Sequence, residues 1–405
     1  MATNKDKTVS ILMVGIGGYG YCYLTSLLQE CEVDQIQIVG VVDPIARQSP
    51  GYDELKRLHI PICPQISEFY ADGRMADLAI IASPIQYHYL QTRIALKHGT
   101  YVLCEKPVSA LVQEVDQLIK IRDDSNKWVM VGYQWSYSKA IQDLKKDIRA
   151  GLFGRPVRLK TLCFWPRGDA YYQRNNWAGK MIDSNDAWIL DSPVNNAMAH
   201  FLHNLLYVLG EDTHLSAIPE TVVAEIYRAN PIENYDTAAC RIYTDQGTEL
   251  LFYASHATLG TKDAIFNFQF ENAVISFNEF SGEIIAIDKN GKEKSYGSPD
   301  DDHHFLKLFE AIETVRNPKP IVCGLEAARS QTLCMNAIQN AVSEIKPFPK
   351  SLVQRDELKK RFWVNGLDSA LCDCYHNNEL PHEAGCTWAK RNETFQIKKD
   401  FQFIV

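Results

Sequence analysis

Short, unbroken apolar runs alternate with longer amphipathic stretches over residues 9–133. The runs are rich in β-branched residues and lack polar alternation, which is typical of parallel strands buried on both faces of a sheet. The stretches between them, such as 84–98 and 110–123, are long enough for helices. This alternation predicts a doubly wound α/β sheet. The predicted strands are 9–14, 36–42, 78–82, 101–104 and 128–131.

The pattern changes near Tyr133. A helix is predicted at 139–150 and a strand at 157–164, followed by an antiparallel meander from 221 to 296. Its turns are expected at 245–247, 281–282 and 290–291, where glycine follows polar residues. Two helices, 302–315 and 325–342, come next. The sequence therefore predicts a Rossmann domain, 1–132, and an α+β domain, 133–405, with a large and mainly antiparallel sheet.

Charge and composition exclude several classes of protein. The net charge is −8 and no long run of Lys or Arg occurs, so no nucleic-acid partner is expected. No apolar stretch reaches the roughly 20 residues that cross a bilayer. Residues 1–8 are polar, and the apolar run after them carries a glycine motif instead of a cleavage site. Eleven cysteines form no paired framework. A cytoplasmic protein with reduced thiols and no membrane partner is expected.

One segment near the C-terminus gathers cysteines and histidines. Their spacing is unlike the usual zinc patterns, so a loop with incidental cysteines and no metal is expected. The residues are Cys372, Cys374, His376, His382 and Cys386.

A glycine motif follows the first predicted strand directly and leads into a predicted helix. In this context the glycines allow the backbone to approach a pyrophosphate at a helix N-terminus. Asp43 ends the second strand, where a carboxylate binds the adenosine ribose and repels a 2′-phosphate. NAD is therefore favoured over NADP, although Arg47 leaves NADP open. The motif consists of Gly15, Gly17, Gly18, Tyr19 and Gly20.

Further motifs give the chain a family resemblance. Residues 101–107 end in Glu105-Lys106-Pro107, and upstream stands Ser83-Pro84 with His88 four residues later. With the glycine motif, with 132–134 and with 151–154, these resemble the Gfo/Idh/MocA family of sugar and cyclitol oxidoreductases. The likeness covers residues 9 to about 210. It implies NAD contacts from Ser83, Pro84, His88, Glu105, Lys106 and Gln134.

The resemblance also implies that Lys106 is catalytic. The lysine stands at the carboxyl end of a central strand, where ligands of open α/β sheets bind. Cationic nicotinamide beside the amine would lower the pKa of Lys106 and favour a neutral base. A surface lysine beside a proline turn is the structural alternative.

A second polar group lies on the predicted helix after Asp191. Asn196, His200, His203 and Tyr207 fall within roughly 60° of one another on a helix whose other residues are apolar. A cavity beside this stripe, or a hydrogen-bonded structural role, explains it. The family pattern is Asp-x-x-x-His, so His200 matches as a second catalytic residue while Asn196 replaces the aspartate. His203 stands where another aspartate is common. No metal is expected, because no carboxylate completes the His-x-x-His spacing.

Residues 165–177 mix aromatic rings with hydrogen-bonding side chains, which suits the apolar faces and polar rim of a sugar ring. A loop packed by its own aromatics is the alternative. A phosphate-bearing substrate is less favoured, because Arg167 and Arg174 are the only local cations. The expected substrate contacts are Lys106, Trp165, Arg167, Arg174, Asn196, His200 and His203.

These observations predict an NAD-dependent enzyme that moves hydride between nicotinamide and a ring CH–OH carbon of a sugar, glycoside or cyclitol. An NAD-recycling glycosidase or lyase acting through a 3-keto sugar, and a non-catalytic dinucleotide sensor, are the alternatives. The meander offers a broad face that needs covering, so a homodimer or homotetramer through that sheet is expected.

Overall fold

The computed structural model describes residues 8–31, 35–277, 280 and 282–404, and the chain divides into two compact units. Unit 1 comprises Met1–Ser109, Gln113–Tyr137 and Asp302–Arg329. Unit 2 comprises Ala110–Val112, Ser138–Asp301 and Ser330–Val405. The structure thus differs from the single boundary expected after residue 132, because a segment distant in sequence returns to unit 1.

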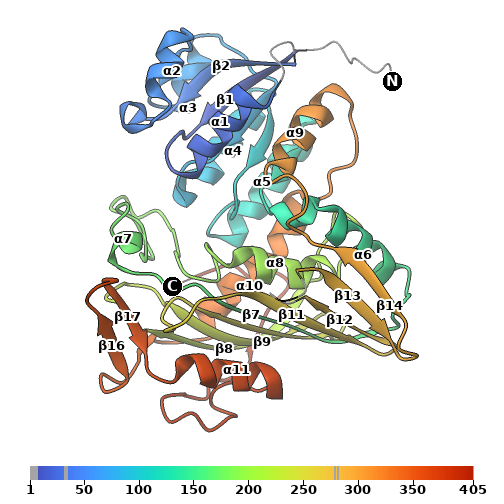
Figure 1. Cartoon of the computed structure of the whole chain (residues 1–405). Helices are drawn as coiled ribbons and strands as arrows, with labels where there is room; N and C mark the ends of the chain where they lie inside the picture. The colour runs from blue at the N-terminus through green and yellow to red at the C-terminus, as the bar shows by residue number, and fades with distance from the viewer. Residues whose placement is uncertain (1–7, 32–34, 278–279, 281, 405) are drawn as a thin grey trace. The chain divides into compact units, whose positions relative to one another are not determined.

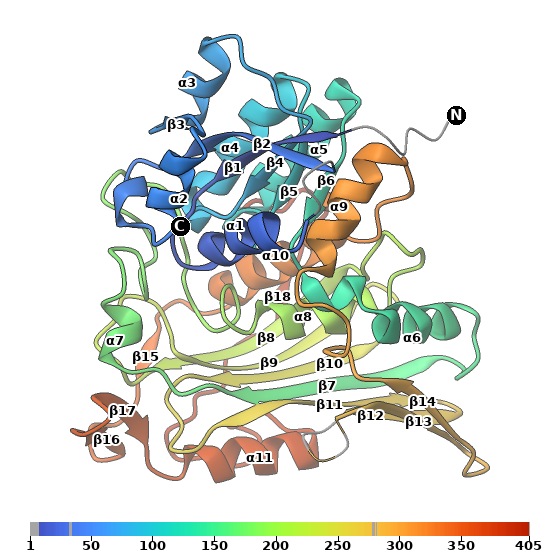
Figure 2. The ribbon, with the colours of Figure 1, turned by 45° about the horizontal axis from the view of Figure 1, so that its top comes forward.

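Unit 1 is built on a six-stranded parallel sheet of order β3-β2-β1-β4-β5-β6 (Figures 1 and 2). The strand order reverses between β1 and β4, as in a doubly wound fold. The predicted Rossmann fold is confirmed, and β3 is the strand that the sequence did not reveal. The strands are β1 (Val9–Val14), β2 (Ile36–Val42), β3 (Ile62–Cys63), β4 (Leu78–Ile81), β5 (Tyr101–Cys104) and β6 (Val129–Val131).

Helices connect these strands. The predicted helices 84–98 and 110–123 are present as α4 (Ile85–Lys97) and α5 (Val112–Ser125). The remaining helical elements before residue 138 are α1 (Tyr19–Gln29), η1 (Ala46–Gln48), α2 (Tyr52–Arg57), α3 (Ile66–Ala71) and η2 (Gln134–Tyr137).

The returning segment of unit 1 carries α9 (Leu306–Arg316), which packs against β1, β4 and β5. Phe305 at its start contacts the rings of Tyr19 and Tyr23, with centroids 5.7 and 4.9 Å apart. Lys307 in its first turn is 1% exposed. The sequence predicted this helix but not its place beside the parallel sheet.

Unit 2 contains a ten-stranded, mainly antiparallel sheet of order β14-β13-β12-β11-β7-β10-β9-β8-β15, with β18 paired to β8. The predicted sheet is confirmed, with one departure from a simple meander. Strand β7 inserts between β11 and β10 and runs parallel to β10. The strands up to residue 300 are β7 (Pro156–Phe164), β8 (Pro219–Arg228), β9 (Thr237–Thr244), β10 (Glu249–Ser255), β11 (Lys262–Phe270), β12 (Ala273–Phe277), β13 (Ile284–Asp288) and β14 (Glu293–Gly297).

Two of the three predicted turns are confirmed by the strands that they join. Residues 245–247 connect β9 to β10, and 290–291 connect β13 to β14. The third prediction includes Ser281, which lies outside the described residues. The helices of this part are α6 (Lys139–Arg149), α7 (Asp169–Tyr172), α8 (Ala199–Tyr207) and α10 (Leu325–Asn340), of which α10 crosses the boundary between the units.

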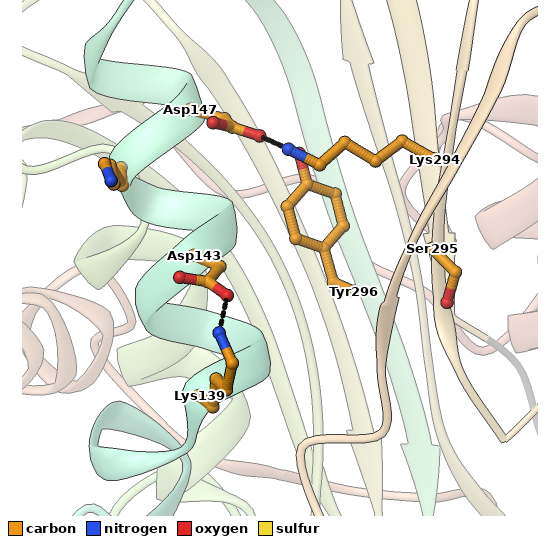
Figure 3. Close-up of a pocket in the computed structure, with 7 residues that line it drawn as sticks. Lys139, Asp143, Asp147, Lys294, Ser295 and Tyr296 are labelled. Atoms are coloured by element: carbon orange, nitrogen blue, oxygen red, sulfur yellow. Dashed lines mark hydrogen bonds and ion pairs between the residues drawn. The ribbon is translucent and has the colours of Figure 1, made fainter.

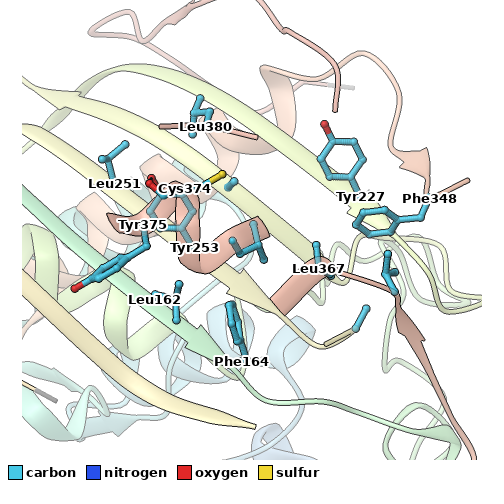
Figure 4. Packing of buried hydrophobic residues seen from close by; sticks show 14 residues of the cluster. Leu162, Phe164, Tyr227, Leu251, Tyr253, Phe348, Leu367, Cys374, Tyr375 and Leu380 are labelled. Atoms are coloured by element: carbon cyan, nitrogen blue, oxygen red, sulfur yellow. The ribbon is translucent and has the colours of Figure 1, made fainter. Parts of the chain in front are cut away.

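Residues 346–396, here called the C-terminal segment, cover one face of the sheet in unit 2. Figure 1 shows α11 (Leu367–Asn377) and α8 against opposite faces. Apolar side chains of the segment pack onto β7, β8, β9 and β10, and each member of this cluster is at most 6% exposed (Figure 4). The segment also contains β15 (Lys346–Pro347), the hairpin β16 (Val353–Asp356) and β17 (Arg361–Val364), and β18 (Phe395–Gln396). The cluster pairs Leu162, Phe164, Tyr227, Ala239, Leu251 and Tyr253 of the sheet with Phe348, Val364, Leu367, Leu371, Cys374, Tyr375 and Leu380 of the segment.

Polar contacts fix the same segment to the sheet. The Tyr253 hydroxyl donates to the carbonyl of Glu379 at 2.8 Å, and Lys160 Nζ donates to the carbonyl of Tyr375 at 2.6 Å. The predicted dimer or tetramer was based on an uncovered face, which over β7 to β10 is occupied by the chain itself. Self-association through the rest of the sheet stays a prediction.

The cysteine-rich segment is partly helical, in contrast to the expected loop, because Cys372, Cys374 and His376 lie on α11. Among the described residues, no three His, Cys, Asp or Glu side chains are grouped as metal ligands. His382 instead contacts Glu225 through Nδ1 at 2.6 Å. Within the same described part, no helix has the length and hydropathy needed to cross a membrane.

Candidate functional site

The glycine loop joins β1 to α1 and has room for a ligand beside it. Gly15 has φ +83°, and a Cβ there would lie 2.7 Å from the backbone nitrogen of Ser83. A Cβ on Gly20 would lie 2.2 Å from the carbonyl oxygen of Gly15, so glycine is required for close packing. A Cβ on Gly17, in contrast, would meet no atom within 4 Å, and no side chain caps α1. Open backbone at a helix N-terminus is what a pyrophosphate requires.

Asp43 at the end of β2 is fixed beside this loop. Its Oδ2 accepts the Ile16 N–H and its Oδ1 accepts the Ile45 N–H, both at 2.9 Å. Each carboxylate oxygen keeps a further lone pair that can accept a ribose hydroxyl. Arg47 lies nearby in η1 and is exposed. The structure therefore brings the predicted acidic residue to the glycine loop.

His88 joins the two remaining motifs of unit 1. It is 1% exposed, with Nε2 2.7 Å from the Ser83 carbonyl oxygen and Nδ1 2.7 Å from that of Pro107. Burial holds the pKa of His88 below its usual value, although both carbonyl contacts oppose this shift. His88 thus ties the loop after β4 to the loop after β5. Its contact with a cofactor stays a prediction, as do those of Ser83, Pro84 and Gln134.

Glu105, at the end of β5, belongs to a buried charge network. Its Oε1 pairs with Lys307 Nζ and accepts the Tyr23 hydroxyl at 2.7 Å. Burial alone would raise the pKa of Glu105, but the charges of Lys307 and Lys106 lower it below the usual value. Lys307 Nζ also donates to the Gly132 carbonyl at 3.1 Å. Glu105 therefore acts as an anchor, and its contact with a cofactor stays a prediction.

Lys106 follows this anchor and is partly exposed. Its backbone N–H donates to Oε2 of Glu105 at 3.2 Å, so the same carboxylate that binds Lys307 fixes the backbone of Lys106. Unit 1 thereby places Lys106 at the carboxyl edge of the parallel sheet, where the glycine loop also lies. Lys307 and Tyr23 are members of this network that the sequence analysis did not single out.

In unit 2, the predicted helix stripe is shorter than expected. Helix α8 begins at Ala199, so Asn196 lies in the preceding turn and His200 in the first turn of the helix. Asn196 Nδ2 donates to Asp191 Oδ1 at 2.7 Å, and Asp191 Oδ2 accepts the Gly179 N–H at 2.6 Å. The family pattern has an aspartate at position 196. In this chain Asp191 supplies the carboxylate, one hydrogen bond away from Asn196.

This arrangement predicts the effect of Asn196→Asp on stability. Two carboxylates at the present 2.7 Å spacing cannot both ionise easily, so the pKa of one is raised. A carboxyl group with a raised folded-state pKa costs stability once the pH exceeds its unfolded value of about 3.9, and the full cost is reached above the folded-state pKa. The loss of stability should be about 1–3 kcal/mol greater near pH 7.5 than near pH 5.

Urea unfolding at the two pH values measures this difference. Asn196→Ala is the matched control, because it removes the same hydrogen bond without adding charge, and its loss should depend little on pH. Equal losses for Asn196→Asp at both pH values would contradict the proximity of the two side chains.

His203 and Tyr207 lie in the interior. His203 is 1% exposed and its ring stacks on that of Tyr207, with centroids 5.3 Å apart. Burial, together with the charge of Lys145, holds the pKa of His203 well below its usual value. The Tyr207 hydroxyl accepts Gln142 Nε2 at 2.7 Å. These contacts match the structural alternative for this part of the stripe, and a contact of His203 with substrate stays a prediction.

The aromatic segment 165–177 lies beside α8. The rings of Trp165 and Phe201 meet edge to face with centroids 5.4 Å apart. Arg167 and Arg174 both lie over the ring of Tyr171, at 4.8 and 3.6 Å from its centroid. Unit 2 thus brings the predicted substrate residues of this segment close to the helix that carries His200.

A separate cavity of about 430 Å³ in unit 2 contains none of these residues (Figure 3). It lies between α6 and β14, and its charges largely pair with one another. Lys294 contacts Asp147, which also accepts the Tyr296 hydroxyl at 2.6 Å, and Lys139 contacts Asp143. Charges that pair with one another in this way do not indicate a binding or catalytic site.

Residues 9–133 match the family model GFO_IDH_MocA, described as an oxidoreductase family with an NAD-binding Rossmann fold. The glycine loop, Asp43 and Lys106 all lie within this matched part, and the predicted resemblance is confirmed.

Curated relatives match part of the chain. The 2,7-anhydro-N-acetylneuraminate hydratase of Mediterraneibacter gnavus is 26% identical over 149 residues, which are 37% of this chain and 38% of the relative. The inositol 2-dehydrogenase of Burkholderia multivorans is 24% identical over 212 residues, 51% of this chain and 56% of the relative. The matches thus span from over a third to just over half of these Gfo/Idh/MocA relatives.

Solved structures show the same fold over most of the chain. The WlbA dehydrogenase of Bordetella pertussis, solved with NADH and UDP-GlcNAcA, has a TM-score of 0.68 at 20% identity, covering 82% of this chain and 96% of its own. The UDP-N-acetylglucosamine 3-dehydrogenase GnnA of Acidithiobacillus ferrooxidans has a TM-score of 0.64 at 17% identity, covering 83% of this chain and 98% of its own. About a sixth of the present chain lies outside each of these two matches.

Proposed function

We propose that this protein is an NAD(H)-dependent oxidoreductase acting on a ring CH–OH carbon of a sugar, glycoside or cyclitol. The observation that carries the proposal is Lys106 at the carboxyl edge of the sheet that also presents the open glycine loop. Inositol 2-dehydrogenase among the relatives, and NADH in a solved structure of the same fold, support it. A cytoplasmic location is part of the same proposal.

The residues of unit 1 suit NAD. The backbone at Gly17 and the uncapped start of α1 would hold the pyrophosphate, and Asp43 would accept the ribose hydroxyls. When bound, nicotinamide supplies the hydride chemistry. Lys106 would take the hydroxyl proton of the substrate through Nζ. The hydrogen bond from its backbone N–H to Glu105 would fix the position of the side chain.

The residues of unit 2 would bind and orient the substrate. His200 would share the proton transfer, since it is partly exposed in the first turn of α8. Asn196, Trp165, Arg167 and Arg174 would contact the ring and its hydroxyls. In this proposal Asp191 positions Asn196.

A panel of free sugars, inositols and glycosides tests the proposal, with formation of NADH as the readout. We expect at least one member to reduce NAD in proportion to enzyme concentration. If every member is inert with both NAD and NADP, the substrate class is wrong.

The similarity to a hydratase favours a second candidate, an NAD-recycling glycosidase or lyase, in which NAD is reduced by the substrate and reoxidised by the intermediate within one turnover. That enzyme would change its substrate without net NADH, and cofactor would remain bound after purification. Product analysis by mass spectrometry alongside the NADH assay separates the two candidates.

The cofactor site yields a direct prediction for Asp43→Ala. The variant should bind NAD more weakly by on the order of 1–3 kcal/mol, because a hydrogen-bonded carboxylate is lost. The difference between its affinities for NAD and NADP should also become smaller. Binding is measured by calorimetry with both cofactors. Asp72→Ala, which removes the carboxylate that pairs with Arg74 in the same unit, is the control. Equal affinity of wild type and Asp43→Ala for NAD would exclude Asp43 from the ribose site.

A further inference from the structure

Arg167 has no anionic partner within the described part of the chain. Its guanidinium lies 4.8 Å from the ring centroid of Tyr171 and 5.8 Å from that of Trp165, and its Nε is buried without a hydrogen-bond partner. Burying an unpartnered donor of a charged group costs more than burying a neutral one. Five other arginines of unit 2 are paired with carboxylates, namely Arg149, Arg155, Arg158, Arg241 and Arg355.

A second unpaired charge lies on the same ring. Arg174 is 3.6 Å from the Tyr171 centroid, and its Nη1 donates to the carbonyl of Tyr171 instead of a carboxylate. Carboxylates around this segment are already engaged by other groups. Asp169 pairs with Arg355 at 2.8 Å, and Asp263 accepts Trp165 Nε1 at 2.9 Å. Asp191 accepts Asn196 and Gly179.

Neutral hydrogen-bonding groups complete the surroundings of Arg167. His256 is 2% exposed, and burial, assisted by the charge of Arg167, lowers the pKa of His256 to about 3. Because its Nδ1 lies 2.7 Å from the Trp165 carbonyl oxygen, the proton sits on Nδ1 and Nε2 is an acceptor, which has no partner among the described residues. The buried Tyr172 hydroxyl has no partner among them either.

We infer that the substrate of the proposed reaction carries an anionic group, a carboxylate or a phosphate, which Arg167 binds. The inference rests on the proposed function for its reaction but names a property of the substrate that the function alone does not require. A guanidinium presents parallel donors that match two anionic oxygens. The aromatic rings suit the C–H face of the sugar, and His256 Nε2 would accept one of its hydroxyls. Arg174, which is exposed and lies over the same Tyr171 ring, adds positive charge beside Arg167.

Calorimetry on the 405-residue chain in the presence of NADH tests this inference with two matched sets of three ligands. The probes are glucose, glucuronate and glucose 6-phosphate, and galactose, galacturonate and galactose 6-phosphate. We expect at least one acid to bind about 10- to 100-fold more tightly than its neutral counterpart, the range for a charged hydrogen bond. Preference for the uronate identifies a carboxylate, and preference for the phosphate ester identifies a phosphate.

Variants separate recognition of charge from support of the loop. Arg167→Gln should reduce the affinity for the preferred acid much more than the affinity for the neutral sugar, so that most of the preference for the acid is lost. Arg167→Lys should keep part of the preference, because it keeps the charge but loses the planar donors. Arg155→Gln, which removes an exposed pair with Glu271 at the other end of β7, is the control and should keep the full preference.

Three results would overturn the inference: equal binding of acids and neutral sugars, failure of every acid to bind, or an equal loss for both classes in Arg167→Gln. Formation of NADH with the same panel is measured separately. Tighter binding of an acid without formation of NADH would support the role of Arg167 and contradict the proposed dehydrogenase activity. Formation of NADH from neutral sugars alone would support the proposed dehydrogenase activity and contradict an anionic group on the substrate.

Discussion

Lys106→Ala is expected to lower kcat for oxidation of the substrate by about 10²–10⁴-fold, the usual range for loss of an acid–base group. The side chain follows a strand end whose backbone is held by the buried Glu105 carboxylate, so an amine at this position is aligned by the fold. Alanine removes the amine and leaves that anchor in place. Steady-state formation of NADH over a range of pH measures the effect, and the wild-type profile should show an ionisation that the variant lacks.

Binding must be separated from chemistry in this variant. The affinity for NADH, followed by fluorescence, should fall far less than kcat, because the glycine loop and Asp43, which would hold the pyrophosphate and the ribose, are unchanged. Lys97→Ala, an exposed lysine at the end of α4, is the control and should keep full activity. Retention of more than a tenth of the wild-type kcat in Lys106→Ala would mean that another group takes the proton.

The second large effect concerns stability. Lys307→Met should destabilise the protein by about 3–5 kcal/mol, because Glu105 would remain buried without its cationic partner. The two side chains are 1% and 9% exposed, so water cannot replace the lost charge easily. Urea unfolding gives the change. In Lys307→Met combined with Glu105→Gln, much of the loss should be recovered, since the buried charge is then removed as well.

A matched surface pair provides the control. Lys319 and Glu310 belong to the same returning segment but are 38% and 35% exposed, and Lys319→Met should cost at most about 1 kcal/mol. The effect of pH has a defined sign. The pKa of Glu105 is lowered in the folded state, so its contribution is present above the unfolded value of about 4.3 and is lost as the pH falls. The free energy of unfolding lost in Lys307→Met should therefore be smaller at acidic pH. Equal costs for the two lysine variants would refute the importance of the buried pair.

Local patterns predicted the helices and strands well, because burial on both faces of a strand, or on one side of a helix, requires a characteristic spacing of apolar residues within a short stretch of sequence. The five predicted strands of the Rossmann sheet are present, and the glycine loop and Asp43 meet as expected. These features depend on residues close in sequence or on a topology that the order of elements implies.

Contacts between distant residues had no such signal. Lys307 pairs with Glu105 across about 200 positions, and nothing near position 307 marks that lysine as buried. Asp191 could not be recognised as the partner of Asn196, because the turn before α8 was expected to be helical. The insertion of β7 between β11 and β10 likewise depends on pairing that no local pattern encodes.

The C-terminal segment has a consequence for the order in which the chain is made. Leu162, Phe164, Leu251 and Tyr253 are synthesised well before Leu371 and Leu380, the residues that cover them. Synthesis at about 5–20 residues per second leaves the strands complete for several seconds before their cover exists. During that interval the nascent sheet presents an apolar face to whatever else is present. The final burial of this face is thus a late event in biogenesis, because it cannot precede the translation of α11.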